Sequence, residues 1–160
     1  MRIYILTYCI SLLLLASCVE YPDYPPEPQI ELIQATGYQS EDELGNAEKV
    51  VLLEFMLYDG DGNIGHGQSN TSENDFFCTF FVKDNGNFKP LTQFIPDTNN
   101  YKLPQIRDKN NTKFIKAKVS VKMAHSAQTM VYDTVFCTFY VQDRAENKSN
   151  TDTTHIIIFE

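Results

Sequence analysis

A short glycine-rich segment holds the residues of this chain that are best suited to chemistry. Asp59, Asp61 and Asn63 alternate with glycines in the sequence Asp-Gly-Asp-Gly-Asn at positions 59–63. Oxygen side chains with this spacing can curl around a hard cation such as Ca²⁺, at oxygen-to-metal distances of about 2.3–2.6 Å. The same sequence is typical of a sharp glycine turn in which Asp and Asn side chains bond their own backbone. Both interpretations stay open, and Ca²⁺ is the only cofactor that the sequence suggests.

The segment is not a complete EF-hand. When Gly62 and Ile64 are aligned with the glycine and apolar positions of that loop, its first and twelfth positions fall on Leu57 and Gln68. Neither residue carries the carboxylate that an EF-hand places there. A calcium site would therefore need carboxylates from elsewhere, and Asp143, which opens a second polar loop, is the first candidate.

Two cysteines of the body of the chain fall in segments that look like strands. Cys78 and Cys137 each lie on the more apolar side of their segment. An exported protein meets an oxidising environment, so a disulfide between them is possible if the strand register allows it. The alternative is a pair of buried thiols that pack as small apolar side chains.

Motifs of common catalytic sites do not occur in the chain. It contains no Gly-x-Ser-x-Gly, His-Glu-x-x-His or Cys-x-x-Cys sequence. The three histidines, His66, His125 and His155, have no spacing typical of metal ligands and are interpreted as incidental. The sequence therefore predicts a protein that is not an enzyme.

The first 17 residues have the features of an export signal. Arg2 supplies a positive charge, and a mostly apolar run follows that is too short for a transmembrane helix. Leu-Ala-Ser-Cys at positions 15–18 resembles the lipobox of bacterial lipoproteins, in which the cysteine thiol accepts the lipid. We therefore expect a signal peptide over residues 1–17 and lipidation of Cys18. Two or more acyl chains would hold the protein stably on a membrane.

A proline-rich tether follows the expected anchor over residues 18–28. Four of the seven prolines lie in this short stretch, which disfavours helix and favours extended chain. Val19 and the acidic Glu20 and Asp23 after the lipidation site resemble the residues of lipoproteins that are sorted to the outer membrane rather than retained at the inner one. The expected location is thus the cell envelope, with the membrane as one partner through the lipid anchor.

The remaining residues, 29–160, are expected to form one domain. The chain has 160 residues and a formal charge of −8, with 13 basic against 21 acidic side chains, which argues against binding to nucleic acid. Its hydrophobic periodicity is two rather than 3.6, most clearly over 113–123, where apolar residues alternate with lysines. Seven such segments predict an all-β, antiparallel Ig-like β-sandwich of about seven strands; they are 30–35, 50–58, 76–83, 88–94, 113–123, 131–141 and 153–159.

An Ig-like order would place three polar loops at one end of the sandwich. The connections after the second, fourth and sixth strands, 59–75, 96–112 and 142–152, would share that end. Loops on a rigid scaffold carry function more often than strands do. Any binding site is therefore expected there, with Asp59, Asp61 and Asp143 at the same end.

The combination of loop motifs resembles a group of small Bacteroidota lipoproteins with an Ig-like domain. It consists of Asp-Gly-Asp-Gly-Asn-Ile-Gly from Asp59 and Asp-Arg-Ala-x-Asn-Lys-Ser-Asn from Asp143. The resemblance implies an Ig-like sandwich and residence in the periplasm or at the cell surface, and it brings no activity with it. We expect an interaction module for envelope proteins, or alternatively a module that binds a glycan or small ligand with its loops.

Overall fold

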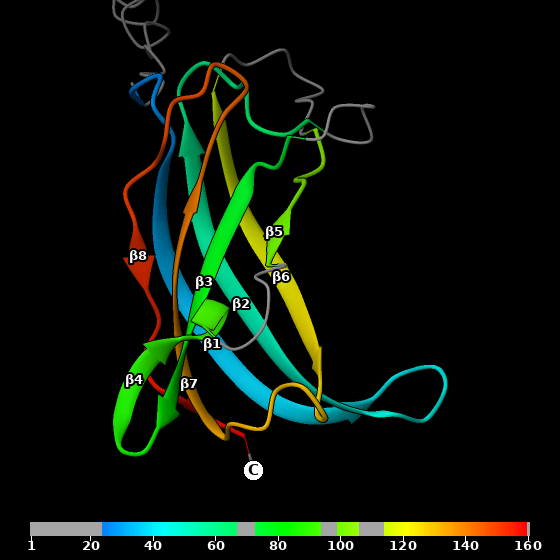
Figure 1. The fold of residues 1–160 in the computed structure, drawn as a ribbon. Helices are drawn as coiled ribbons and strands as arrows, with labels where there is room; N and C mark the ends of the chain where they lie inside the picture. Colours follow the sequence, from blue (N-terminus) through cyan, green and yellow to red (C-terminus); the bar gives the residue numbers. More distant parts are fainter. Residues whose placement is uncertain (1–23, 67–72, 94–98, 106–113, 160) are drawn as a thin grey trace, which may run out of the picture.

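The chain folds as an all-β, antiparallel Ig-like sandwich (Figure 1). The computed structural model describes residues 24–66, 73–93, 99–105 and 114–159. One sheet has the order β1-β2-β6, with β1 at Gln29–Glu41, β2 at Ala47–Asp59 and β6 at Ile115–Ser126. No α-helix occurs in these ranges, and none of their elements is a helix long and apolar enough to cross a membrane.

The second sheet is built around β3 (Phe76–Asp84) and β7 (Thr134–Val141), which pair with each other. On one side of β3 lie β4 (Asn87–Pro90) and β5 (Asn100–Tyr101). On the far side of β7 lie β8 (Asp152–Thr153) and β9 (Ile157–Ile158). A 3₁₀ turn, η1 (Leu91–Gln93), follows β4.

The predicted strands are confirmed, with differences at the edges of the second sheet. The segment at 88–94 is an edge strand as predicted, but it ends at Pro90, which cannot donate to a further ladder. The last predicted strand is divided into β8 and β9. Between them, Thr154 bonds Cys137 through both its backbone N–H and its hydroxyl Oγ1, which interrupts regular pairing.

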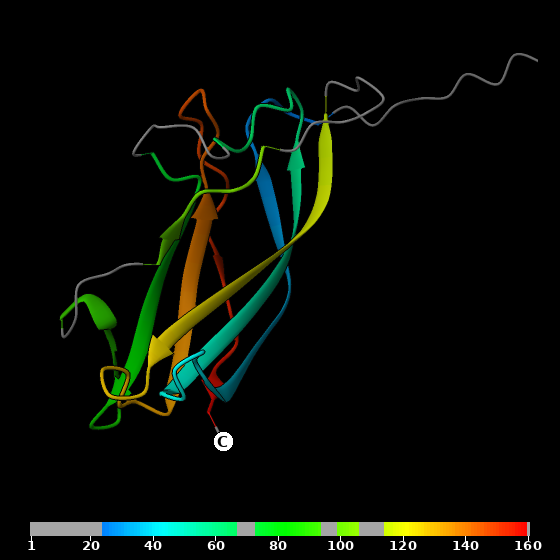
Figure 2. The same ribbon diagram turned by 90° about the vertical axis from the view of Figure 1, so that its right-hand side faces the viewer.

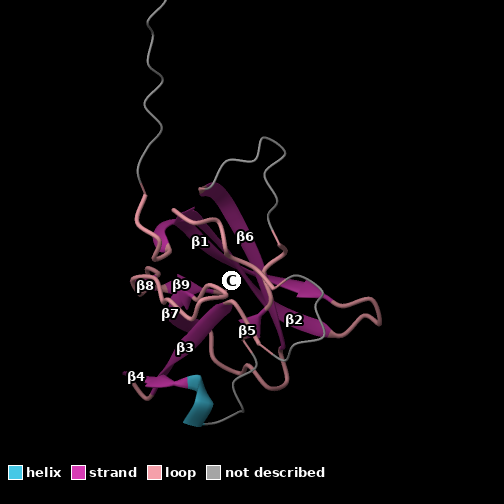
Figure 3. Ribbon diagram, turned by 90° about the horizontal axis from the view of Figure 1, so that it is seen from above, coloured by secondary structure: helices cyan, strands magenta, loops and turns pink. Residues whose placement is uncertain are grey.

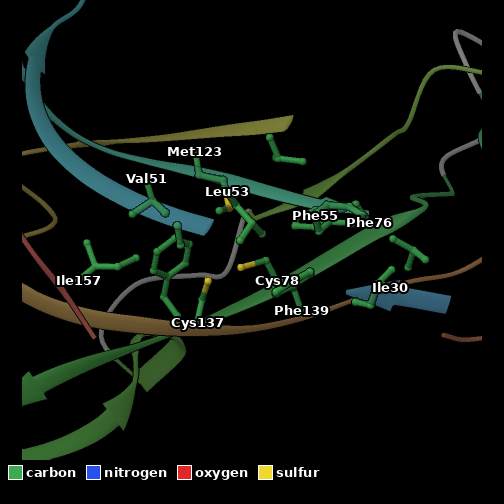
Figure 4. Close-up of a cluster of buried hydrophobic side chains, with 14 of the residues drawn as sticks. Ile30, Val51, Leu53, Phe55, Phe76, Cys78, Met123, Cys137, Phe139 and Ile157 are labelled. Atoms are coloured by element: carbon green, nitrogen blue, oxygen red, sulfur yellow. The ribbon is translucent and has the colours of Figure 1, made fainter. Parts of the chain in front are cut away.

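Alternating apolar side chains from both sheets form the core between them (Figure 4). The ring of Phe55 on β2 packs against those of Phe76 and Phe139 on the second sheet, with centroid distances of 5.9 and 5.3 Å. On β6, Ile115, Val121 and Met123 are buried while the intervening lysines are exposed, as the periodicity predicts.

Cys78 and Cys137 are buried in this core as free cysteines, and no disulfide joins them in this structure. Their strands are neighbours, as predicted, but Cys78 lies opposite Phe139 and Cys137 opposite Phe80. The two cysteines are thus diagonal neighbours rather than a directly opposed pair. A hydrogen bond with the Cys78 thiol lowers the pKa of Cys137.

The outer faces of the two sheets differ in chemistry. On the second sheet, Phe77 stacks on Tyr140 and Phe81 on Phe136, with centroids 4.9 and 4.8 Å apart. Phe88 of β4 packs edge-on against Phe136. We call these five half-buried side chains the aromatic face. The outer face of the first sheet instead carries the exposed β6 lysines, of which Lys118 pairs with Glu54 at 2.8 Å.

The two ends of the sandwich also differ (Figures 1 and 2). One end carries the hairpin turns between β1 and β2 and between β3 and β4. At the other end, β2 and β7 finish and the polar loops begin, and the described chain enters at this same end through Tyr24. The last part of the expected tether packs on the domain there: the Tyr24 ring lies 5.3 Å from that of Tyr58 and 5.6 Å from that of Phe114.

Candidate functional site

Asp75 joins the three polar loops at one end of the sandwich. Its carboxylate is fully buried and accepts hydrogen bonds from the backbone N–H of His66 at 3.1 Å and of Leu103 at 2.9 Å. Its own carbonyl accepts a bond from the N–H of Gln142 at 2.8 Å. One residue thus ties together the described parts of all three predicted loops through its side chain and its backbone, and the expectation that they share an end is confirmed (Figure 1, and end-on in Figure 3).

His66 is not incidental, so that interpretation was wrong. Its ring lies between two carboxylates, with Nδ1 2.5 Å from Asp75 and Nε2 3.0 Å from Glu73, and its side chain is only 13% exposed. The signal in the sequence is weak, since Asp75 follows His66 by nine positions across a loop. Nothing in the spacing shows that the loop folds back on itself.

An open cavity of about 310 Å³ lies beside this histidine. Its lining includes His66, Glu73, Gln142 and Arg144, and also Phe77, which belongs to the aromatic face. Polar groups of both charges therefore face the cavity. Such a lining suits a small polar ligand better than an apolar one.

The pattern Asp-x-x-x-Asn occurs in three loops of the domain, and in two of them it forms the same closed structure. In the loop at 42–46, Asp42 Oδ1 accepts from the N–H groups of Leu44 and Asn46, and Oδ2 accepts from Asn46 Nδ2, each at 2.8 Å. In the loop at 143–147, Asp143 makes the equivalent bonds to Ala145 and Asn147 at 2.8–2.9 Å.

The two closed loops match in their backbones as well. The N–H of the aspartate bonds the carbonyl of the asparagine in both, at 2.9 and 3.0 Å. The residue before the asparagine has positive φ in both, Gly45 at 81° and Glu146 at 68°. These are self-sufficient turns of the kind that the glycine-turn interpretation describes.

Asp143 therefore closes its own loop and does not join Asp59 and Asp61. Both of its oxygens are engaged within residues 143–147. Across the described ranges, no three His, Cys, Asp or Glu side chains gather in a way that could hold a metal ion. Asp143 does lie at the predicted end, since the N–H of Arg144 bonds the Asn63 carbonyl at 3.4 Å.

The third Asp-x-x-x-Asn loop, at 59–63, is not closed in this way, and we call it the open loop. Asp59 is completely buried, and its Oδ2 accepts a bond from the N–H of Ile64 at 3.0 Å. Asn63 bonds Asp61 instead, through Nδ2 at 2.8 Å. Asp59 Oδ1 and Asn63 Oδ1 are both buried and accept no hydrogen bond.

The electrostatics of the two kinds of loop are opposite. Burial, together with the neighbouring Asp61 carboxylate, raises the pKa of Asp59 to about 6. Hydrogen bonds from Asn46 lower the pKa of Asp42. The open loop thus disfavours the negative charge that the closed loop stabilises.

Glycines and the incoming chain hold the open loop in place. The N–H of Gly60 donates to the Pro25 carbonyl at 3.0 Å, and a Cβ on Gly60 would lie 2.1 Å from the Tyr24 carbonyl oxygen. Gly62 and Gly65 have φ of 69° and 88°, which favours glycine. These contacts hold the loop in place without any hydrogen bond to Asp59 Oδ1 or Asn63 Oδ1.

No protein-family model, no curated protein and no solved structure matches this chain. Cys18 and the rest of the predicted signal and anchor lie outside the described residues.

Proposed function

We propose that this chain is a non-enzymatic, lipid-anchored protein of the cell envelope, whose sandwich binds a partner protein with its aromatic face. The observation that carries the proposal is the pair of ring stacks, Phe77 on Tyr140 and Phe81 on Phe136, on the outer side of the second sheet. Partly exposed aromatic side chains are enriched in protein interfaces because they bury a large area with few rotatable bonds. On the outer face of the first sheet, Tyr58 instead packs against Tyr24 of the incoming chain, and β6 exposes lysines.

The position of the tether favours a sheet face over the loop end as the surface for a large partner. Tyr24 lies six positions after Cys18, and even an extended chain over that distance spans only about 20 Å. If Cys18 carries the lipid, the loop end lies close to the bilayer and the sheet faces stand beside the anchor. The aromatic face would then be open to an envelope protein that stands on the same membrane.

A photo-cross-linking experiment in intact cells tests this proposal. A benzophenone side chain replaces Phe88 at the edge of the aromatic face or, as a control, Lys122 on the opposite face, in the full chain. We expect a discrete cross-linked protein from position 88 that is lost when Phe81→Ser is added, and none from position 122. The same product from both positions, or none from position 88, would contradict the proposed interface.

The anchor is tested separately. Cys18→Ala should leave the precursor unprocessed and abolish labelling by a fatty-acid analogue, because the lipid acceptor is gone. Normal labelling of this variant would show that the anchor is elsewhere.

A second candidate function, binding of a glycan or another small polar ligand, is favoured by the cavity at the loop end. Its lining combines His66, Glu73 and Arg144, which offer both donors and acceptors to hydroxyl groups. Soluble oligosaccharides that shift the melting temperature of the wild type, but not of Arg144→Ala, would support this candidate over the first.

A further inference from the structure

We propose that the open loop is a Ca²⁺ site whose protein ligands are Asp59 Oδ1, Asn63 Oδ1 and the carboxylate of Asp61. Each oxygen of Asp61 accepts one bond from Asn63 and keeps a second lone pair for the cation. The proposal is independent of the lipid anchor and of the aromatic face, because it concerns only atoms within residues 59–63.

Two buried oxygen atoms that accept no hydrogen bond point to this ligand. Asp59 has no exposed surface, and its Oδ1 is unpartnered; Asn63 Oδ1 is in the same state within the same five residues. Buried acceptors are nearly always satisfied in folded proteins, and an unsatisfied one calls for a donor or a cation. A single cation between Asp59 and Asn63 would satisfy both atoms.

The closed loops show that the spacing of the residues does not by itself leave these two oxygens without hydrogen bonds. With the same Asp-x-x-x-Asn pattern, Asp42 and Asp143 each use both oxygens within their own loop. In the open loop, Asn63 turns its amide N–H₂ to Asp61 and leaves the carbonyl oxygen without a donor. A loop whose oxygens lack hydrogen-bond donors, and whose own N–H groups bond other atoms, is suited to bind a cation.

The charges of the loop call for a cation rather than a water molecule. Two carboxylates lie in this loop, and neither takes part in an ion pair with any described residue. Arg144, which is close by, donates its Nη1 to the Gly65 carbonyl at 2.9 Å instead of to a carboxylate. Water could bond the orphaned oxygens, but it would not balance the charge of Asp59 and Asp61.

The ligand set fits calcium better than magnesium. Two carboxylates and one amide oxygen in a glycine-rich loop leave the remaining positions to backbone carbonyls and water, which suits the six to eight ligands of Ca²⁺. Mg²⁺ demands a near-ideal octahedron and gives up its waters reluctantly. With few charged ligands the affinity should be that of extracellular modules, with Kd of roughly 10⁻⁴ to 10⁻³ M.

The test is thermal unfolding of the full chain in detergent, followed by circular dichroism in chelator, in CaCl₂ and in MgCl₂. At calcium ten times above Kd we expect the melting temperature to rise by about 5 °C. Asp61→Asn, at an exposed position, should abolish the rise. Asp42→Asn, the matched change in a closed loop, should keep it.

Equilibrium dialysis with radioactive calcium gives a readout that does not depend on stability. We expect about one ion bound per wild-type chain and per Asp42→Asn chain, and none per Asp61→Asn chain. Identical melting curves in calcium and chelator, an equal rise with magnesium, or undiminished calcium binding by Asp61→Asn would each overturn the proposal.

Discussion

The loops at 59–63 and 143–147 lie at the same end of the domain and share one sequence pattern, yet they use it in opposite ways. In the second, Asp143 and Asn147 bond each other and the intervening backbone, and the loop is complete. In the first, the Asn63 side chain bonds Asp61 instead of Asp59, and Asp59 and Asn63 each keep a buried oxygen without a partner. Because the first and last residues of the pattern are the same, the three residues between them decide whether the loop closes.

Asp61 is the residue that makes the difference. Its carboxylate accepts hydrogen bonds from both the backbone N–H and the side-chain N–H₂ of Asn63. In the closed loops, the same groups of the asparagine bond the first aspartate. Gly60 and Gly62 allow the backbone to adopt the conformation that these bonds require, with Gly62 at positive φ. A second aspartate flanked by glycines therefore converts a closed turn into an open set of oxygens.

The largest predicted effect on stability comes from the closed loop at 143–147. Asp143→Ala should lower the free energy of unfolding by about 3 kcal/mol, because Asp143 is 2% exposed and its loss leaves three donors without their acceptor. Denaturant unfolding measures the change, which should be the same in calcium and in chelator. Asp42→Ala, in the more exposed copy of this loop, serves as the control and should cost less. A calcium-dependent cost for Asp143→Ala would mean that Asp143 is a ligand after all.

The next largest effect should be a pH dependence of the free energy of unfolding that comes from Asp59 in the open loop. The folded-state pKa of Asp59 is about 6, raised from 3.8, so the folded protein binds this proton more tightly than the unfolded chain does. In chelator, this group's contribution to stability is full below about pH 4 and is lost as the pH rises through 6. The loss is up to about 1.4 kcal/mol per pH unit.

Asp59→Asn isolates this contribution, since the variant cannot titrate at that position. The difference in unfolding free energy between wild type and Asp59→Asn, measured in chelator from pH 4 to 7, should shift against the wild type as the pH rises. A difference that is constant with pH, or one that shifts in favour of the wild type, would contradict the raised pKa.

The smallest effect concerns the backbone of the closed loop. Glu146 is held at a φ of 68°, where its counterpart in the loop at 42–46 is Gly45. Glu146→Gly should stabilise the domain by about 0.5–1 kcal/mol, because it relieves the left-handed conformation. Gly45→Ala should destabilise it for the same reason. If Glu146→Gly lowers the melting temperature, the two loops are less alike than their hydrogen bonds indicate.

The sheets could be predicted from the sequence because their side chains alternate with a period of two. The lysines of β6 and the phenylalanines of β3 each fix which face is buried. The short strands could not be predicted: β5 has two residues, and β8 and β9 are divided at Thr154 by bonds to Cys137 that only the tertiary structure supplies.

The candidate site was predicted only in part. The glycine spacing located Asp59, Asp61 and Asn63, and the strand order placed Asp143 at the same end. That Asp143 closes its own loop could have been inferred from the repeated Asp-x-x-x-Asn spacing at 42–46 and 143–147. The burial of His66 between Glu73 and Asp75 could not, because it depends on how a long loop folds back.

The most direct test of the difference between the open and closed loops is a calcium titration of the isotopically labelled chain followed by amide NMR. We expect the amide signals of residues 59–64 to shift and saturate together, with the N–H of Ile64, which bonds Asp59, among the most affected. Signals of residues 42–46 should not move, and those of 145–147 should move little. Shifts of similar size in all three loops, or none at residues 59–64 in millimolar calcium, would contradict a calcium site in the open loop alone.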